Sequence, residues 1–443
     1  MSLSIFSLPL SSWFNSTNES LRPPPVDLSQ FQRLHTQSEH RTLAEIPPER
    51  SGHRCFYGSD DVFYVVGGYS ANVSVRGVES VIYREVWALN LLSKKWKRMT
   101  ISGSFPTALA SFSLAQREPY SDIFMVFGGS GATFGASNSN KMFEVVVDDE
   151  KSMAIGKERV AMSDNVKAPS YGHAMISGPS PGIYFIVGGT NGFEYNLDIH
   201  VFKTIRHLGI EAVIWDYLTT QQDGGAYRME IILDDNRLFV FGGGTSRDVL
   251  GFDIMFFYNL DTGGFEVIKP IGDENDDYPV ARRCHSATQW GREVVIAGGC
   301  TPRGAGLGEI IVLEDVWFFH LDTFRWRRHH YNLVDPVFFH SAAVSTEGCL
   351  TIFGGTLDES SKHRSNTTQI CWLAPPSLKT FATWSLKKHF PSVFEDDGAD
   401  LRLRDSTKII KRFFGYSSDA EKNCETPSFE EEPLLSEVDF AFA

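Results

Sequence analysis

The sequence predicts an all-β fold, a six-bladed β-propeller followed by a short C-terminal helical segment. Three observations predict this fold: six apolar strands each end in a Gly-Gly pair, the pairs recur every 54 to 61 residues, and a large aromatic residue follows several pairs. The first glycines of the pairs occupy positions 67, 128, 188, 242, 298 and 354. Short strands repeated at slightly more than about 50 residues are typical of propeller blades.

The repeating unit is clearest between residues 293 and 326. The apolar strand VVIAGG (294–299) ends in Gly-Gly, a long loop follows, and EDVWFFHLDTFRW (314–326) supplies two further strands. Trp326 lies seven residues after Phe319, and equivalent pairs occur in blades one and four: Leu89 with Trp96, and Tyr258 with Phe265. We expect the glycines where crowding and positive φ exclude a Cβ atom, and the aromatic residues between neighbouring sheets. This pattern is that of kelch repeats.

The chain divides into four predicted segments. Residues 1–29 form a disordered leader, and residues 30–374 form the propeller. The stretch FQRLHTQ (31–37) is expected to supply the outermost strand of the last blade, because only QICWLA (369–374) is apparent after its Gly-Gly loop. Residues 375–414 carry a helical pattern, and residues 415–443 are an acidic tail expected to be disordered.

Composition narrows the class of protein. The net charge of −14 argues against nucleic-acid binding, which favours a basic face. The six cysteines show no metal-binding spacing and are expected to be reduced core residues. The N-terminus lacks the basic region of a signal peptide, and no apolar run has the length of a membrane span. We therefore expect a protein of the cytoplasm, with the nucleus as second location, and no membrane partner.

No catalytic constellation is apparent, so we predict a protein that is not an enzyme and has no cofactor or metal. The sequence lacks a Walker loop and the motifs GxSxG and HExxH. One histidine recurs 13 to 15 residues before the Gly-Gly pair in four blades: His53, His173, His285 and His340. Because the recurrence follows the repeat, we interpret these histidines as packing residues and not as metal ligands.

The loops that lead into each first strand and leave each Gly-Gly pair are expected to form one mouth. Arg50, Tyr171, Arg228, Arg282, Arg283 and Phe338 lie on the entering side, and Ser246 on the leaving side. Guanidinium groups bind carboxylates through two parallel hydrogen bonds, so this mixture favours an anionic ligand with a small end. The alternative is that these arginines pair with acidic residues of the rim.

Four longer segments carry a more specific resemblance. SGHRC (51–55), RRCHS (282–286), LDTFRW (321–326) and DPVFFHSAAVSTEGC (335–349) resemble the kelch domain-containing protein 10 family, kelch substrate receptors of cullin-2 RING ubiquitin ligases. The similarity extends from about Ser51 to Phe413. AYRME (226–230) departs from the family, with Ala226 and Met229 where an arginine and a histidine are expected, and segments 145–165 and 203–215 also differ.

The resemblance implies partners and sites. A BC box, matched here by Ser377, Leu378, Ala382 and Leu386, would dock on elongin C of the elongin B/C pair. A cullin-selecting segment, matched loosely by Phe390, Pro391 and Val393, would bind cullin-2 and with it the RING-box protein.

The resemblance also implies a substrate class. The propeller would bind substrate proteins with a free C-terminal glycine, leading to their ubiquitination and proteasomal degradation. Arg228, Arg282, Arg283 and Ser246 would then hold the terminal carboxylate, with Tyr171 and Phe338 as walls and Arg50 at the rim.

A second interpretation stays open at this point. The chain would be a non-ligase kelch scaffold for signalling or cytoskeletal interactions, and its helices would only cap the propeller. An enzyme is the third and weakest interpretation.

Overall fold

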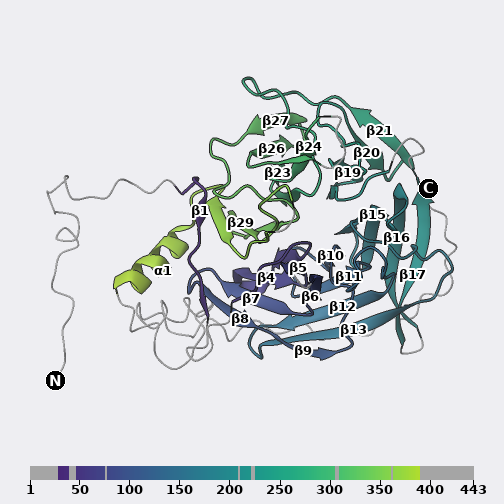
Figure 1. Cartoon of the computed structure of the whole chain (residues 1–443), viewed down its shortest axis with the longest axis horizontal. Coiled ribbons are helices and arrows are strands. Elements are labelled where there is room, and N and C mark those ends of the chain that lie inside the picture. Colours follow the sequence, from purple (N-terminus) through teal and green to yellow (C-terminus); the bar gives the residue numbers. More distant parts are fainter. Residues whose placement is uncertain are drawn as a thin grey trace, which may run out of the picture.

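The structure, a computed structural model, describes residues 28–38, 46–74, 77–207, 210–220, 225–304, 309–360 and 363–389. Figure 1 shows the strands arranged as blades around a central axis, which confirms the predicted six-bladed propeller. A single helix in the described part of the chain, α1 (Leu378–His389), lies outside the ring. None of the described helical residues forms an apolar helix long enough to cross a membrane.

Blades one to three contain the following strands, counted outward from the axis. Blade one has β3 (Arg54–Tyr57), β4 (Val62–Val66), β7 (Val86–Asn90) and β8 (Lys95–Arg98), with a 3-10 turn, η3 (Ser59–Asp61), between its first two strands. Blade two has β10 (Ser113–Gln116), β11 (Ile123–Phe127), β12 (Met142–Asp148) and β13 (Met153–Ala161). Blade three has β14 (Ala174–Ser177), β15 (Ile183–Thr190), β16 (Tyr195–His207) and β17 (Ile210–Thr219).

Blades four to six follow the same plan. Blade four has β18 (Glu230–Asp234), β19 (Arg237–Phe241), β20 (Met255–Asn259) and β21 (Gly264–Ile268). Blade five has β22 (Ser286–Trp290), β23 (Glu293–Ala297), β26 (Val316–His320) and β27 (Arg325–Arg328). Blade six has β28 (Ser341–Val344), β29 (Cys349–Phe353), β30 (Thr368–Trp372) and, from the N-terminal region, β1 (Gln32–Arg33).

The N-terminal stretch closes the ring, as the FQRLHTQ segment leads one to expect. β1 pairs antiparallel with β30, and the Leu34 N–H donates to the Thr368 carbonyl at 2.8 Å. The sequence does not predict that the chain then crosses to blade one, where β2 (Gln37–Ser38) pairs in parallel with β8. One segment therefore joins the first blade to the last, which leaves fewer open strand edges at the closure.

Two further additions extend the regular blades. β13 and β17 pair in parallel, with Val160 opposite Ala212, so blades two and three form one continuous sheet that also includes β9 (Thr100–Gly103). Two hairpins leave the Gly-Gly loops: β5 (Tyr69–Ser74) with β6 (Gly77–Ile82) in blade one, and β24 (Cys300–Pro302) with β25 (Ile310–Val312) in blade five. Both begin directly after a Gly-Gly pair.

The hydrophobic core lies between the blades. Six clusters of buried residues each join two neighbouring blades around the ring, including one between blades six and one. The tryptophans of the repeat are among them: Trp96 contacts Phe353 of blade six with ring centroids 5.3 Å apart, and Trp326 contacts Phe252 of blade four at 5.2 Å. A single blade could not bury these faces alone, so the blades stabilise one another.

The Gly-Gly pairs and the recurrent histidines have one joint explanation. Both glycines of every pair have positive φ, between 54° and 111°. A Cβ atom at Gly354 would lie 2.7 Å from the His53 ring, and one at Gly128 would lie 2.6 Å from the His173 ring. The histidine of one blade therefore fills the space left by the glycine of the preceding blade. The interpretation of the histidines as packing residues is confirmed.

These buried histidines make stability depend on pH. Burial lowers the pKa of His53, His173 and His285 well below the usual value, and lowers that of His340 to about 4. Below a pH of about 6.5 these histidines therefore bind protons in the unfolded chain but stay neutral in the folded protein. Stability is expected to be full above that pH and to fall as the pH drops toward 4, by up to about 1.4 kcal/mol per pH unit for each histidine.

The check is denaturant unfolding at several pH values for the wild type, for His340→Gln and for His330→Gln. The slope of unfolding free energy against pH measures how many protons unfolding takes up. In His340→Gln this number should fall by about one, so the slope should be shallower. His330→Gln is the control for the substitution itself, because His330 is exposed and the unfolding midpoint of this variant at neutral pH should match that of the wild type. Equal slopes in the wild type and His340→Gln would contradict the assignment.

Candidate functional site

The axis of the propeller is closed by a ring of backbone hydrogen bonds. One residue from each blade takes part: Gly52, Ser111, Gly172, Arg228, Cys284 and Phe339. The N–H of each donates to the carbonyl of the ring residue in the preceding blade, at 2.7 to 3.0 Å, and the Gly52 N–H closes the circle on Phe339. All six have positive φ, between 55° and 67°. This conformation is rare for residues with a side chain, so four of the six positions carry backbone strain.

The residue before each ring position forms a second tier. These residues are Ser51, Ala110, Tyr171, Tyr227, Arg283 and Phe338, and each forms an isolated bridge to the residue that follows a Gly-Gly pair. The predicted mouth therefore exists, and entering and leaving loops meet there by main-chain pairing. We use "mouth" below for this second tier and the side chains that contact it.

Arg228 carries a buried positive charge at the axis. Its side chain is 7% exposed, its Nη2 donates to the Ser111 hydroxyl, and its guanidinium lies 4.7 Å from the centre of the Phe339 ring. Its Nε is buried without a hydrogen-bond partner, and no ion pair to Arg228 occurs within the described residues. Glu230, two residues later, is instead paired with Arg54 of blade one at 2.7 Å. Burial lowers the pKa of the Arg228 guanidinium.

Two more arginines reach the mouth without a carboxylate among the described residues. Arg283 donates to the Thr245 carbonyl of blade four. Arg364, from the loop before β30, donates through Nε to the Ser51 hydroxyl at 3.0 Å and stacks over the Tyr69 ring at 4.8 Å. Burial lowers the pKa of Arg364. The mouth therefore holds three guanidinium groups that its own acids do not neutralise, a composition that favours an anionic ligand.

Aromatic side chains line the mouth from blade one to blade four. Successive ring centroids are 5.1 to 6.1 Å apart along a chain of mostly edge-on contacts formed by Tyr69, Phe134, Tyr171, Tyr227 and Tyr195. Arg283 and Arg364 come from blades five and six. The mouth therefore has an aromatic side and a cationic side, with Arg228 on the axis between them.

The structure corrects the expectation for Arg50 and Arg282. Both side chains are 0% exposed and lie inside their blades, so they do not line the mouth. Arg282 binds Asp315 through two hydrogen bonds of 2.7 Å, and Arg50 binds Glu85 at 2.9 Å. Each also donates to the carbonyl of the first glycine of its own Gly-Gly pair. The alternative of internal pairing is thus correct for these two arginines.

Of the other predicted mouth residues, some are accessible at the mouth and one is buried beneath it. Tyr171 is half-buried in the aromatic side, as proposed for a wall, whereas Phe338 is 2% exposed and packs with Cys284 and Cys300 below the surface. Ser246 is exposed in the loop whose Thr245 carbonyl accepts from Arg283. Arg364, Phe134 and Tyr195 also contact the mouth. Each lies at least four residues beyond a Gly-Gly pair, where no repeated pattern marks the position.

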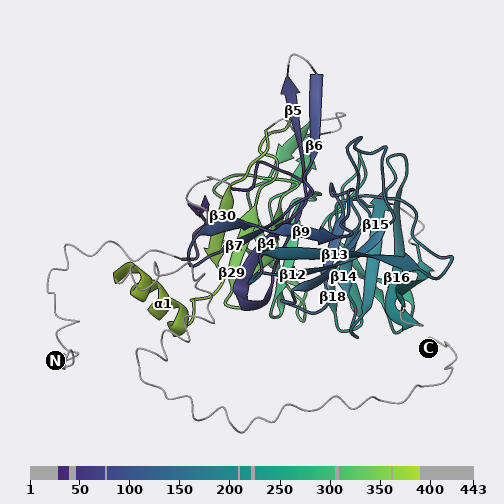
Figure 2. The ribbon, with the colours of Figure 1, turned by 90° about the horizontal axis from the view of Figure 1, so that it is seen from below.

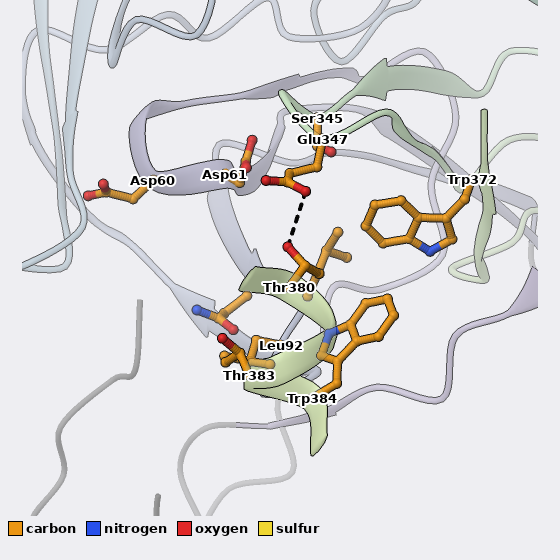
Figure 3. A pocket seen from close by; sticks show the side chains of 11 residues that line it. Asp60, Asp61, Leu92, Ser345, Glu347, Trp372, Thr380, Thr383 and Trp384 are labelled. Carbon is orange, nitrogen blue, oxygen red and sulfur yellow. Dashed lines mark hydrogen bonds between the residues drawn. The ribbon is translucent and has the colours of Figure 1, made fainter. Parts of the chain in front are cut away.

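The helix α1 is the second candidate site. Ser377 caps its first turn, because the Thr380 N–H donates to the Ser377 hydroxyl at 3.2 Å. Figure 3 shows Thr380, Thr383 and Trp384 on the side of α1 that faces the propeller. These residues line a small cleft of about 50 Å³ together with Glu347 of blade six and Leu92 of blade one. Glu347 of blade six accepts from the Ser377 N–H at 2.8 Å and from the Thr380 hydroxyl at 3.2 Å. Trp384 and Trp372 meet edge-on at 5.4 Å.

The opposite face of α1 is apolar and open to solvent. Leu378 is 88% exposed and Phe381 is 41% exposed, and Ala382 is also exposed. The side chain of Leu386, together with Phe390, Pro391 and Val393, lies outside the residues whose side chains the structure describes. No group of three or more metal-binding side chains occurs among the described residues.

Comparison with known proteins identifies the family. A family profile described as the KLHDC2/KLHL20/DRC7 Kelch-repeats domain matches residues 26–224 and 207–392. Kelch domain-containing protein 10 of Rattus norvegicus is 34% identical over 358 residues, covering 78% of this chain and 81% of the relative. The chain belongs to the Kelch domain-containing protein 10 family.

Other members of the family match over most of this chain and most of their own length. Kelch domain-containing protein 10 of Homo sapiens is 34% identical over 358 residues, with 78% of this chain and 75% of the relative covered. The Xenopus tropicalis protein of the same name is 33% identical over 418 residues, with 91% and 92% covered. The kelch propeller of this family is a protein-interaction module, and the mouth and the open face of α1 are two surfaces it offers.

Proposed function

We propose that this chain is the substrate-recognition subunit of an elongin B/C–cullin-2 RING ubiquitin ligase. In this role the mouth binds the C-terminal tail of a substrate protein that ends in glycine, and α1 binds elongin C. The chain has no catalytic step of its own; it raises the local concentration of substrate near ubiquitin carried elsewhere in the assembly. The proposed site of action is the cytoplasm, with the nucleus as second location.

The observation that carries the ligase part is the exposed apolar face of α1. Leu378 is 88% exposed and lies beside the exposed Phe381 and Ala382, so three apolar residues form one patch on α1. Leu378, Phe381 and Ala382 are spaced as the anchors of a helix that docks in an apolar groove. The face opposite them is fixed to blade six through Glu347, so α1 presents these anchors at a defined orientation.

The substrate part is supported by the unpaired guanidinium groups of the mouth. A buried charge without a partner is unfavourable, and a carboxylate would supply the missing partner to Arg228. The free end of a polypeptide is a carboxylate that internal residues lack. Arg283, Arg364 and the mouth hydroxyls could then contact the same group or the peptide bonds that precede it.

The proposal predicts the effect of placing charge on the open face of α1. Leu378→Asp combined with Ala382→Asp is expected to reduce capture of purified elongin B/C by more than about 100-fold, because two carboxylates would have to enter an apolar groove. Both positions are exposed, so the melting temperature should stay close to that of the wild type. Binding is measured by titration with purified elongin B/C.

Lys379→Asp is the matched control, because Lys379 is exposed but lies outside the apolar face. Capture should be retained in this variant. Equal capture by the double variant and the wild type would rule out α1 as the elongin-binding helix.

One observation favours the scaffold as a second candidate. α1 is already packed on blade six through Thr380 and Trp384, which is what a helix that only caps the propeller would do. Under this alternative, wild-type protein would not bind elongin B/C at any tested concentration. The same titration therefore distinguishes the two functions.

A further inference from the structure

The hairpin of β5 and β6 stands outside its blade. Figure 2 shows the two strands projecting beyond one face of the propeller, and in Figure 1 they lie near the centre of the ring. Their antiparallel register runs from Tyr69 opposite Ile82 to Ser74 opposite Gly77. Tyr69, the first residue of β5, belongs to the aromatic side of the mouth. The hairpin therefore rises directly from the proposed substrate site.

One edge of β5 faces the axial side. Tyr69 exchanges both of its main-chain hydrogen bonds with Ser51, at 2.9 Å each, and Ser51 precedes the ring residue Gly52. Main-chain groups of alternate residues in a strand face the same side. Ala71 and Val73 therefore present their N–H and carbonyl groups on the side where Tyr69 meets Ser51. Within the described residues, these two N–H groups have no backbone partner.

Arg364 connects this edge to the mouth. Its Nε donates to the Ser51 hydroxyl at 3.0 Å, and its Nη1 lies 3.4 Å from the Ala71 carbonyl. The same guanidinium stacks on Tyr69. Arg364 thus occupies the Ala71 carbonyl, and a chain that leaves the mouth past Arg364 next meets the outward Ala71 N–H and the main chain of Val73.

The sequence and register of β5 also lack the usual protection against pairing. Natural edge strands are commonly blocked by lysine, proline, a bulge or a covering segment. β5 reads YSANVS, which contains neither proline nor a charged residue, and its register with β6 has no bulge. An unprotected edge of this kind is suited to pairing with another extended chain.

We propose that this edge of β5 binds the stretch of substrate just before its C-terminal tail as an added β-strand. The inference rests on the proposed function, since it assumes that the tail itself lies in the mouth. A substrate whose C-terminus is at the axis runs toward the mouth, whereas β5 runs away from it, so the two strands are antiparallel. Hydrogen bonds to Ala71 and Val73 would recognise the main chain of the substrate independently of its side chains.

The test compares two peptides of serine and threonine that end in glycine. One has about four residues and fills only the mouth, and the other has about twelve, enough to span roughly 40 Å when extended. The wild type is expected to bind the longer peptide about tenfold more tightly, from two to four added main-chain hydrogen bonds. Val73→Pro should remove this gain without changing binding of the short peptide, because proline lacks the outward N–H.

Val78→Pro is the matched control. Val78 lies directly opposite Val73, on the far edge of the hairpin, so both peptides should bind this variant as they bind the wild type. Equal affinity of the wild type for both peptides, or equal losses in the two proline variants, would overturn the inference while leaving the proposed function intact. Failure of both peptides to bind the wild type would overturn both.

A second copy of this chain is the competing occupant of the edge. Sedimentation of the wild type would then show a concentration-dependent dimer that Val73→Pro abolishes and Val78→Pro retains. That outcome would also overturn the inference. A monomer in all three proteins, together with the length-dependent affinity, would support it.

Discussion

Replacing Arg228 with methionine is expected to abolish binding of a glycine-ended peptide and to raise the melting temperature. The guanidinium is 7% exposed, its Nε has no partner, and no acid pairs with it among the described residues. Removing an unpaired buried charge relieves an unfavourable term in the folded protein. The same substitution removes the group proposed to bind the substrate carboxylate, so affinity should fall by more than about 100-fold. Calorimetric titration and thermal unfolding measure the two effects.

Amidation of the peptide supplies an independent check on the carboxylate. The wild type should lose affinity for the amidated peptide, whereas Arg228→Met should bind the acid and the amide equally weakly. Arg247→Met is the matched control, because Arg247 is exposed in the loop after the fourth Gly-Gly pair. Retained binding in Arg228→Met, or a clear loss of its stability, would contradict the assigned role.

The result expected for Arg228→Met, higher stability together with lost peptide binding, is informative because substitution of most buried polar residues gives the opposite change in stability. Most buried polar residues stabilise the fold through satisfied partners, and their removal is destabilising. A strained backbone at φ 58°, a buried charge and an unsatisfied donor occur together at Arg228. Such features tend to gather at functional sites, where ligand binding offsets them.

The sequence predicts the blades well because each repeat carries its own packing signals. One or both glycines of each pair contact a histidine of the repeat, and the tryptophans contact phenylalanines of the neighbouring blade. Each signal lies within the period of the repeat, so its recurrence reveals a shared structural role. Blade three lacks the seven-residue spacing, yet Trp215 still packs on Phe127 of blade two with centroids 5.0 Å apart. A longer β16 and β17 hairpin moves the tryptophan along the chain without changing its place in the core.

The mouth is harder to predict because its chemistry depends on residues far apart in sequence. Arg228 and Arg282 both precede the first strand of a blade, but only Arg282 is paired with an acid of its own blade. Glu230 of blade four is paired with Arg54 of blade one. The distinguishing signal is local: Asp315 precedes Val316 and Trp317, and the Trp317 Nε1 donates to the same carboxylate at 2.6 Å. Blade one repeats the arrangement with EVW at 85–87. Blade four has Ala226 at the position of Arg50 and Arg282, and Arg228 lies two residues later, in the axial ring. There Arg228 has no ion-pair partner among the described residues.

The parallel strand pairs and the axial ring are not predicted by any motif in the sequence. The parallel pairing of β13 with β17 and of β2 with β8 joins elements through main-chain groups, which any residue other than proline can supply. The axial ring uses serine, arginine, cysteine and phenylalanine in a conformation that favours glycine. These four residues accept it because neighbouring blades fix the backbone on both sides.

Replacing Arg282 with methionine is expected to lower the free energy of unfolding by about 3–5 kcal/mol, because it breaks a buried pair and leaves Asp315 without its partner. Burial raises the pKa of Asp315, but the hydrogen bonds and charge of Arg282 outweigh it and hold that pKa below its usual value. Without Arg282 the carboxyl would be buried and charged at neutral pH. Burial alone would raise the pKa of this carboxyl above its ordinary value, so its protonation should recover part of the loss. The difference in unfolding free energy from the wild type should therefore begin to shrink above a pH of about 4 and continue to shrink as the pH falls further.

The double variant Arg282→Met with Asp315→Leu supplies the control for this pair. Removing both charges should restore most of the stability, because an apolar pair of similar volume avoids the desolvation of the ions. Peptide affinity measured on the folded fraction should remain that of the wild type in both variants, since Arg282 is 0% exposed. Arg228 and Arg282 would then show opposite behaviour, one required for binding and the other for the fold. Loss of peptide affinity in a fully folded double variant would instead return Arg282 to the mouth.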